Sequence, residues 1–287
     1  MTTPIGSAPA TEVEVGLAAP EPGPRQLAPF GRRRCRVSLT EPAGNYRLVG
    51  ADDPDGPAPL PGQFYMLAAE RWGEGSIQRP YLSRAFSVCR VRGPRLDFLV
   101  DAIGPGTRRL AALRPGEELW LVGPLGIGFS APPAGARALL VGGGIGIAPL
   151  VIWQEALQEA AIDVRAVLGF RSAAYCEATA LFDGDPTIAT DDGTRGHHGL
   201  VTDLLERELR SGDLQVVYAC GPPRMLETVR ALCAEREIAA ELAMEEGMAC
   251  GFGACYGCVV KTNGGYRRLC VDGPIVRASD LDPSWLP

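Results

Sequence analysis

Four cysteines within 21 residues of one another near the C-terminus constrain this chain more than any other feature. They follow the spacing C-x4-C-x2-C with a fourth cysteine farther along, which is typical of plant-type [2Fe–2S] sites: Cys250, Cys255, Cys258 and Cys270. Two irons bridged by sulfides need four thiolates, so one loop must wrap the cluster and deliver three of them. Glycines between the cysteines allow that tight loop and let backbone N–H groups approach the sulfurs. We therefore predict a [2Fe–2S] cluster with these four ligands.

The cysteine pattern also allows two alternatives. A zinc site with four thiolate ligands usually has two separate C-x2-C pairs, whereas this chain has one, Cys255 and Cys258. The four cysteines could also be buried side chains without a metal. Three of the remaining cysteines lie in strand-like or helical patterns that indicate a protein core: Cys35, Cys89 and Cys233.

Charge and hydropathy exclude several classes of partner. The net charge of −6 argues against a broad nucleic-acid surface. The longest uncharged apolar stretch, residues 138–154, contains four glycines and a proline and is too short to cross a bilayer. The N-terminus lacks the basic start and apolar block of a signal peptide, and nine cysteines in such a chain indicate metal or redox work. We expect a cytoplasmic protein without a membrane or nucleic-acid partner.

The chain divides into four expected segments. Residues 1–30 are rich in Pro, Ala, Gly and Glu, which predicts a disordered tail. Residues 31–133 contain short extended runs separated by Gly and Pro, which predicts a small antiparallel β-barrel. Residues 134–240 alternate strands and helices, the pattern of a parallel sheet with right-handed crossovers. Residues 241–287 form the cysteine-rich remainder, so the expected fold class is multidomain, with the cluster in a small C-terminal domain.

Individual elements are expected where apolar periodicity is clear. In the barrel we predict strands at residues 35–39, 63–68, 85–91, 96–100 and 118–122, an exposed loop at 51–61 and a helix at 108–113. In the α/β segment we predict strands at residues 137–141, 164–170, 187–189 and 216–219, and helices at 149–161, 201–209 and 223–236.

A glycine-rich turn in the α/β segment follows an expected strand and opens an expected helix. Its glycines let a diphosphate lie on backbone N–H groups at the positive end of the helix: Gly143, Gly144 and Gly146. The turn is not a full G-x-G-x-x-G motif, because Ile147 stands where the last glycine belongs. A tight strand–helix turn without a ligand therefore remains the alternative.

Two further motifs end expected strands of the same sheet. Cys220, Gly221 and Pro222 follow the strand at 216–219, at the carboxyl edge where ligands of α/β sheets collect; a buried core thiol is the alternative for Cys220. Asp191 and Asp192 follow the strand at 187–189. Their negative charge disfavours the 2′-phosphate of NADP, so NAD is the expected nucleotide, with acids of a surface turn as the alternative.

The barrel segment contains two candidate phosphate-binding motifs. The first pairs a fixed cation with a hydroxyl on one strand: Arg84, Ala85, Phe86 and Ser87. The second, residues 104–107, precedes the expected helix at 108–113. Both are candidate flavin and phosphate contacts, although an arginine such as Arg84, taken alone, is more often a surface charge.

Taken in order, the motifs RAFS, GPGT, GPLGIGF, VGGGIGIAP, GFRS, ATDDG and YACGPPRML resemble the ferredoxin–NAD(P) reductase-like flavoproteins. The final stretch, EEGMACGFGACYGCVVK followed by RLCVDGPIV, is similar to the electron-transfer subunits of NAD-dependent dihydroorotate dehydrogenase, class B. The resemblance covers residues 32–280. It implies a barrel that binds FAD, a Rossmann-like domain that binds NAD and a C-terminal [2Fe–2S] domain.

The resemblance also implies roles for single residues. Residues 84–87 would line the flavin and its diphosphate, and Leu99, Val100 and Asp101 would run past it. Gly106 and Thr107 would hold phosphate through N–H and hydroxyl groups. The sequence departs from the family where Ala85 replaces a proline, where Asp101 replaces a frequent basic residue, and where Ile127 replaces a polar residue.

The function implied by the resemblance is electron transfer in de novo synthesis of the pyrimidine nucleotide UMP. A catalytic partner subunit containing FMN would oxidise dihydroorotate, and two copies of each subunit would form a heterotetramer. Electrons would then pass through the cluster to FAD and on to NAD⁺. No acid–base catalytic residue is expected, since the two histidines, His197 and His198, lie together in a glycine-rich turn.

Two alternative functions remain. The chain could serve as the reductase subunit of a hydrogenase, a transhydrogenase-type complex or an oxygenase. It could also be a non-enzymatic scaffold that is stapled by zinc and binds a nucleotide.

Overall fold

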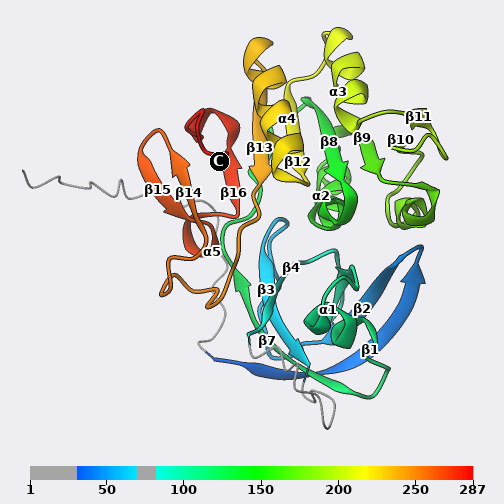
Figure 1. Ribbon diagram of the computed structural model, residues 1–287, viewed down its shortest axis with the longest axis vertical. Coiled ribbons are helices and arrows are strands. Elements are labelled where there is room, and N and C mark those ends of the chain that lie inside the picture. Colours follow the sequence, from blue (N-terminus) through cyan, green and yellow to red (C-terminus); the bar gives the residue numbers. More distant parts are fainter. Residues whose placement is uncertain (1–30, 70–81, 287) are drawn as a thin grey trace, which may run out of the picture.

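The computed structural model describes residues 31–69 and 82–286. The predicted disordered tail, residues 1–30, lies outside these residues. Two large sheets are stacked along the long axis of the molecule, and a smaller C-terminal segment lies beside them (Figure 1). In the described part of the chain, none of the helices combines the length and the apolar character that a membrane span needs.

The N-terminal sheet is antiparallel and has the order β4-β3-β7-β1-β2-β6-β5. Its strands are β1 (Arg33–Ala43), β2 (Tyr46–Asp52), β3 (Phe64–Ala69), β4 (Arg84–Ser87), β5 (Arg90–Arg92), β6 (Arg95–Val100) and β7 (Glu118–Leu125). The two edge strands, β4 and β5, are joined only by Val88 and Cys89, both fully buried. The sheet must therefore curl until its edges meet, which confirms the expected barrel.

One predicted strand and one predicted loop differ from the structure. The strand expected at 85–91 is divided, because the chain passes at Val88 and Cys89 from pairing with β3 to pairing with β6. The loop expected at 51–61 begins two residues late, since residues 51 and 52 belong to β2. The short helix α1 (Pro105–Ala111) begins before the expected residue 108, because Thr107 accepts a hydrogen bond from the Gly104 N–H at 3.0 Å.

The second sheet has the order β11-β10-β9-β8-β12-β13-β16, and only β16 runs antiparallel to its neighbour among the described strands. Its strands are β8 (Arg137–Gly143), β9 (Asp163–Phe170), β10 (Thr187–Thr190), β11 (His197–His198), β12 (Val216–Cys220), β13 (Ala239–Ala243) and β16 (Ile275–Arg277). The connecting helices are η1 (Gly144–Ile147), α2 (Ala148–Glu159), η2 (Ala173–Leu181), α3 (Val201–Arg210) and α4 (Pro223–Glu235). The predicted parallel α/β domain is confirmed.

Alternating residues of β8 explain why both faces of this sheet are covered. Leu140 packs in the same cluster as Leu150 and Trp153 of α2. Leu139 packs on the other side, in the cluster that contains Leu205 of α3 and further residues of α4. A strand that is apolar on both faces requires a helix layer on each side, as in other parallel sheets.

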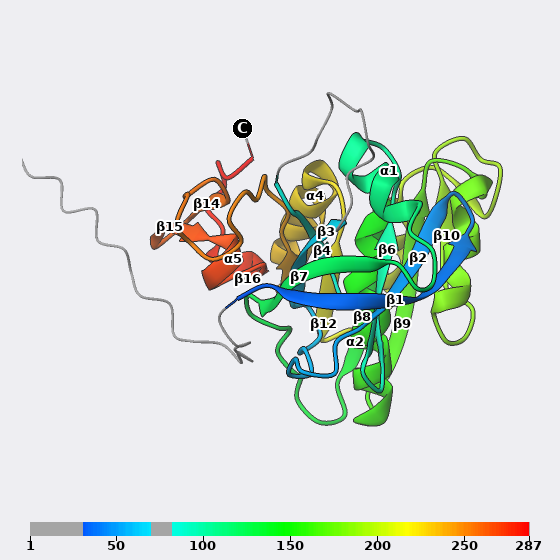
Figure 2. The same cartoon turned by 90° about the horizontal axis from the view of Figure 1, so that it is seen from below.

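The cysteine-rich segment leaves this sheet and returns to it. It contains β14 (Val259–Thr262), β15 (Gly265–Arg268) and α5 (Leu269–Asp272), followed by β16 and η3 (Ala278–Asp280). Two views agree that β14 and β15 lie at the β16 end of the parallel sheet, away from β10 (Figures 1 and 2). The boundary expected after residue 240 falls inside β13, so we propose residues 244–274 as the cluster domain.

Candidate functional site

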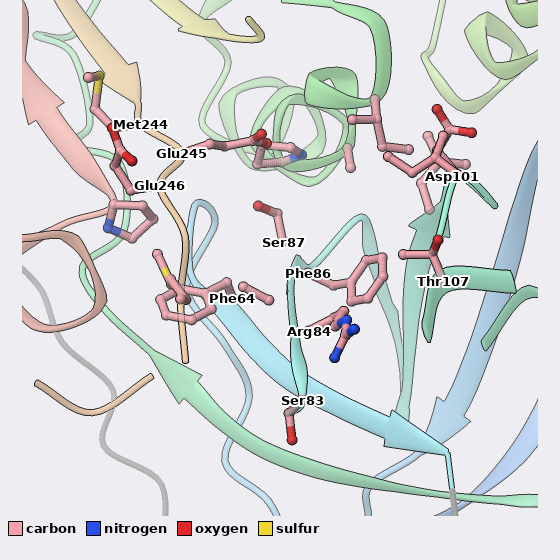
Figure 3. A pocket seen from close by; sticks show the side chains of 18 residues that line it. Phe64, Ser83, Arg84, Phe86, Ser87, Asp101, Thr107, Met244, Glu245 and Glu246 are labelled. Carbon is pink, nitrogen blue, oxygen red and sulfur yellow. The ribbon is translucent and has the colours of Figure 1, made fainter. Parts of the chain in front are cut away.

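A cleft of about 340 Å³ lies between the barrel and the parallel sheet (Figure 3). Arg84, Ala85, Phe86 and Ser87 form one wall from β4. Leu99, Asp101 and Thr107 contribute from β6, the turn after it and α1. Of the nine predicted flavin-binding residues, seven therefore line one cleft, whereas Val100 and Gly106 are buried and do not line it.

Gly106 controls how closely Arg84 approaches the first turn of α1. A Cβ atom at Gly106 would lie 2.7 Å from Nε of Arg84, so only glycine leaves space for the guanidinium there. The cation, the backbone of the turn and the Thr107 side chain consequently adjoin at one end of the cleft. This arrangement suits an anionic phosphate group.

A second, larger pocket of about 590 Å³ lies at the carboxyl edge of the parallel sheet. Five predicted nucleotide-binding residues line it: Gly143, Gly144, Gly146, Gly221 and Pro222. They lie at the end of β8 and in the loops that follow β8 and β12, two neighbouring strands of the sheet. The pocket therefore occupies the crevice where open α/β sheets bind ligands.

Gly146 lets these two loops touch. A Cβ atom at Gly146 would lie 2.6 Å from both the Cys220 carbonyl oxygen and the Gly221 nitrogen. The Cys220 side chain is buried and does not line the pocket, and burial raises the pKa of its thiol well above the usual value. Cys220 thus takes part through its backbone, which supports the core alternative for its sulfur.

The two predicted acids after β10 have different surroundings. Asp191 lines the second pocket. The Asp192 carboxylate instead accepts hydrogen bonds from the N–H and the hydroxyl of Thr194, at 3.0 and 2.6 Å, within the turn. Of the pair, only Asp191 is placed to contact a nucleotide.

Several lining residues were not predicted as site residues. Tyr46 reaches the second pocket from β2 of the barrel, and Arg171 and Tyr175 reach it from the segment after β9. The Tyr46 and Tyr175 rings are 5.1 Å apart, and the Arg171 guanidinium lies 5.2 Å from the Tyr175 ring. These three residues come from two different domains, so the hydrophobic periodicity of either domain does not predict that they share one pocket. Arg171 carried a signal, since it belongs to the motif GFRS directly after a strand.

The two pockets share part of their lining. Asp101, Ile145 and Glu245 line both of them. The Glu245 side chain is accessible from the cleft, but the protein atoms around it reduce the hydration of its carboxyl group. This desolvation raises the pKa of that carboxyl group. Ligands bound in the two pockets would meet at these three residues.

The four predicted cluster ligands lie as two pairs of thiols. The Cys250 and Cys255 side chains interact near the surface, where Cys255 is exposed. The Cys258 and Cys270 side chains interact in the interior. No three His, Cys, Asp or Glu side chains among the described residues are grouped as a site for a single metal ion. Two pairs of sulfurs match a two-iron cluster, in which each iron takes two thiolates.

Backbone N–H groups point at these sulfurs. Burial opposes ionisation of Cys250, but the N–H groups of Phe252, Cys255 and Ala254 outweigh it and lower the pKa of that thiol to about 6. The Gly253 N–H donates to Sγ of Cys270 at 3.1 Å and favours its thiolate, but burial and the neighbouring Cys258 thiol raise the pKa of Cys270 to about 12. Such donors stabilise the thiolate form that binds iron, so the donor set fits the predicted cluster.

The loop that carries the first three cysteines, residues 250–258, shares one stretch of chain with the first pocket. Met244, Glu245, Glu246 and Met248 line the cleft, and Cys250 follows two residues later. Gly251 packs against the barrel so closely that a Cβ atom there would lie 2.5 Å from Cγ of Met66 in β3. The site therefore places two connected pockets and this cysteine loop side by side.

Comparison with known proteins agrees with this arrangement. A family model described as the iron-sulfur cluster binding domain of dihydroorotate dehydrogenase B matches residues 245–282, which include all four cysteines. The chain is 39% identical to the electron transfer subunit of dihydroorotate dehydrogenase B (NAD(+)) from Bacillus caldolyticus, covering 77% of this chain and 86% of that protein. It is 36% identical to the corresponding subunit from Clostridium acetobutylicum, covering 77% and 85%.

Solved structures show the same architecture. The NADH-dependent reduced ferredoxin-NADP oxidoreductase, solved in work on flavin-based electron bifurcation, has a TM-score of 0.74 and 25% identity, covering 92% of this chain and 91% of that chain. The ferredoxin reductase of carbazole 1,9a-dioxygenase shares the fold, with a TM-score of 0.60 and 24% identity over 72% of this chain and 66% of that chain. The two bacterial subunits are 39% and 36% identical to this chain over 77% of its length, so the chain belongs to the family of dihydroorotate dehydrogenase B electron transfer subunits.

Proposed function

We propose that this chain passes electrons from a dihydroorotate-oxidising partner through a [2Fe–2S] cluster and FAD to NAD⁺, in pyrimidine biosynthesis. The observation that carries the proposal is the shared wall between the cleft and the cysteine loop, residues 244–250. A flavin exchanges one or two electrons when bound, so it can stand between a one-electron cluster and a two-electron nicotinamide. The chain's own residues supply position and environment rather than acid–base chemistry.

Each group has a set of residues that would hold it. Arg84 and the first turn of α1 would bind the flavin diphosphate, while Phe86 and Leu99 give apolar contacts in the same cleft. Gly143, Gly144 and Gly146 would let the NAD diphosphate lie close to the backbone after β8. The four cysteines would hold the cluster, with the glycine N–H groups directed at their sulfurs.

We extend the proposal to the partner and the assembly. The partner would be a catalytic subunit that contains FMN, and two copies of each chain would form a cytoplasmic heterotetramer. Phe252 and Tyr256 support an interface at the cysteine loop, since both large side chains are exposed next to Cys255. Electrons would enter through this face and leave through the nucleotide pocket.

The first test uses the full chain purified without air. Its visible spectrum should show flavin and cluster absorbance, with iron and acid-labile sulfide in equal amounts. The variant Cys258→Ser should lose the cluster and retain FAD, because the ligand pairs lie outside the flavin cleft. Cys233→Ser is the matched control, since Cys233 is a buried cysteine of α4 in the core. Loss of FAD together with the cluster would contradict the division into domains.

The second test assigns the substrate. Mixed with an FMN-containing dihydroorotate dehydrogenase, the chain should confer reduction of NAD⁺ by dihydroorotate. The chain by itself should oxidise NADH with artificial acceptors and leave dihydroorotate unchanged. Oxidation of dihydroorotate by this chain without a partner would contradict the assignment.

A further inference from the structure

Two carboxylates stand where the flavin cleft and the nucleotide pocket meet. Asp101 follows β6 of the barrel, and Glu245 follows β13 of the parallel sheet. Both line both pockets, together with the apolar Ile145 of η1. Figure 3 shows both side chains above the strand that carries Phe86 and Ser87 in the view, with Glu245 toward the left and Asp101 toward the right. Two chain segments far apart in sequence thus each bring a carboxyl group to the shared lining of the two pockets.

Neither carboxyl group has a hydrogen-bond or ion-pair partner among the described residues. Among residues 31–69 and 82–286, no hydrogen bond or ion pair engages the Asp101 or the Glu245 side chain. The cations that line the two pockets belong to other elements: Arg84 adjoins α1, Arg171 lies against Tyr175, and Arg224 lies in the first turn of α4. Both carboxyl groups therefore remain free of protein partners in the described residues and can interact with a ligand at the junction.

The position of the junction identifies the part of the ligand that it contacts. This step rests on the proposed function, in which the first pocket holds the flavin and the second holds the nucleotide. Hydride transfer requires the nicotinamide and flavin rings to touch, and the two pockets share only the wall made by Asp101, Ile145 and Glu245 among the described residues. We therefore place the nicotinamide ring at this shared wall, which contains both carboxyl groups.

We propose that Asp101 and Glu245 make this site selective for the oxidised nucleotide. The nicotinamide ring of NAD⁺ carries a positive charge, and that of NADH is neutral. A unit charge several ångströms from a cation, in a partly solvated cleft, changes the binding constant by about threefold to tenfold. The pair attracts the substrate NAD⁺ and lacks that attraction for the product NADH, which speeds product release.

The test compares two ring charges on one protein. The probes are NAD⁺ and 1,4,5,6-tetrahydro-NAD, which has a neutral ring and cannot donate hydride, each titrated into the oxidised full chain with its flavin and cluster. Asp101→Asn and Glu245→Gln should each weaken NAD⁺ binding by about fivefold and change the neutral analogue by less than about twofold. Asp101→Glu retains the charge and should restore the preference.

Asp191→Asn provides the matched control. Asp191 is also an acid of the nucleotide pocket, but it does not line the flavin cleft, so its loss should weaken both probes by the same factor. Equal effects of Asp101→Asn on the two probes, or no effect on either, would overturn the inference. Failure of the unaltered chain to bind either probe would instead overturn the proposed nucleotide site. Retained flavin absorbance of each variant shows that it is folded.

Discussion

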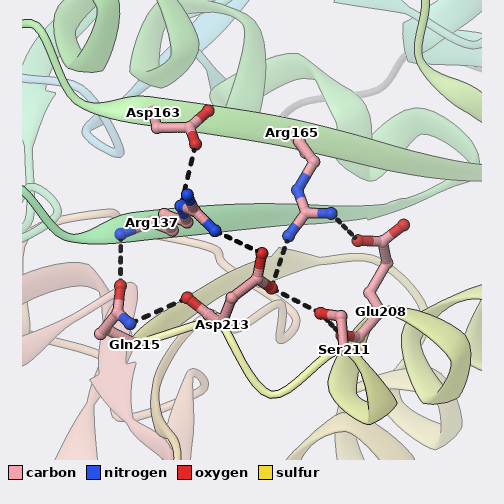
Figure 4. A network of polar contacts seen from close by, with 7 residues as sticks. All are labelled: Arg137, Asp163, Arg165, Glu208, Ser211, Asp213 and Gln215. Atoms are coloured by element: carbon pink, nitrogen blue, oxygen red, sulfur yellow. Dashed lines mark hydrogen bonds and ion pairs between the residues drawn. The ribbon is translucent and has the colours of Figure 1, made fainter.

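The two edges of the parallel sheet carry the same kinds of charged residue and use them in opposite ways. At the amino edge the charges satisfy one another (Figure 4): Arg137 contacts Asp213 at 2.6 Å, and Arg165 contacts Glu208 at 2.7 Å and Asp213 at 3.0 Å. At the carboxyl edge Asp191 and Glu245 have no such partner in the described part of the chain. Paired charges indicate structure, and unpaired charges beside glycine loops indicate a ligand.

The glycines of the two edges differ in the same way. At the carboxyl edge, Gly146 leaves no space for a side chain, because the backbone of the loop after β12 touches it. At the amino edge, Gly212 has open space around it and serves only a turn with φ of +73°. A close backbone approach at one edge creates a binding surface, whereas the other edge only needs to reverse the chain.

The largest expected effect separates these two glycines. Gly146→Ala forces the loops apart, and overpacking of this kind costs about 1–3 kcal/mol, so NAD⁺ binding should weaken about tenfold or more. Gly212→Ala places an alanine in a left-handed conformation, which lowers the free energy of unfolding by about 1 kcal/mol. It should leave NAD⁺ binding unchanged. Titration calorimetry with NAD⁺ checks both variants. Equal nucleotide affinities of the two variants would break the comparison of the edges.

A smaller effect is expected from the charges of the amino edge. A hydrogen bond from Ser211, together with Arg137 and Arg165, lowers the pKa of Asp213 to about 2. A carboxyl whose pKa is lower in the folded state stabilises the fold above its unfolded pKa of about 4, and loses that contribution as pH falls toward 2. Asp213→Asn should therefore lower the melting temperature by about 1–3 °C near neutral pH.

The same variant has a pH signature and a functional control. The difference in melting temperature from the unaltered chain should shrink as pH falls below about 4. NAD⁺ affinity should be unchanged, because Asp213 does not line the nucleotide pocket. A loss of nucleotide binding in Asp213→Asn would show that the two edges are coupled.

The smallest expected effect is a pH dependence at the carboxyl edge. Burial raises the pKa of Glu245, so its carboxyl is protonated at low pH and gains charge as pH rises. The preference for NAD⁺ over the neutral-ring analogue should grow with pH, by less than about threefold, and Glu245→Gln should abolish the change. The other charged groups around the two pockets are Arg84, Asp101, Arg171, Asp191, Arg224 and Glu246. A preference that falls with rising pH would contradict the role of Glu245.

Local sequence signals predicted the parts of the fold that local physics determines. The apolar run of β8 and the helix periodicity of α2 needed no tertiary information. Strand β2 was not predicted because Gly50 and the acids after it are typical of a loop. The structure explains Gly50 by a close approach, since a Cβ atom there would lie 2.6 Å from Oδ1 of the buried Asp97.

Strand β13 was missed for a related reason. Its alanines and Glu241 favour a helix, but pairing with β12 and a hydrogen bond from the Ser130 N–H to Glu241 at 2.9 Å hold the segment extended. Tertiary packing also limits what the sequence predicts about the site. Motifs within one loop, such as the glycines after β8, were predicted, whereas Tyr46 and Glu245 reach the pockets only through the packing of separate domains.

The return of the chain to the parallel sheet fixes where the cysteine loop can be. Residues 244–274 begin after β13 and end before β16, and the Met244 N–H donates to the Pro274 carbonyl at 2.9 Å across that base. The N–H of Ile127, in the connection between the barrel and the sheet, donates a hydrogen bond to the Gly273 carbonyl at the same point. Both ends of this segment are thus bonded to the sheet and to the barrel–sheet connection, so the register of β13 with β16, rather than the length of a tether, sets where the cysteine loop begins and the path that electrons must cross.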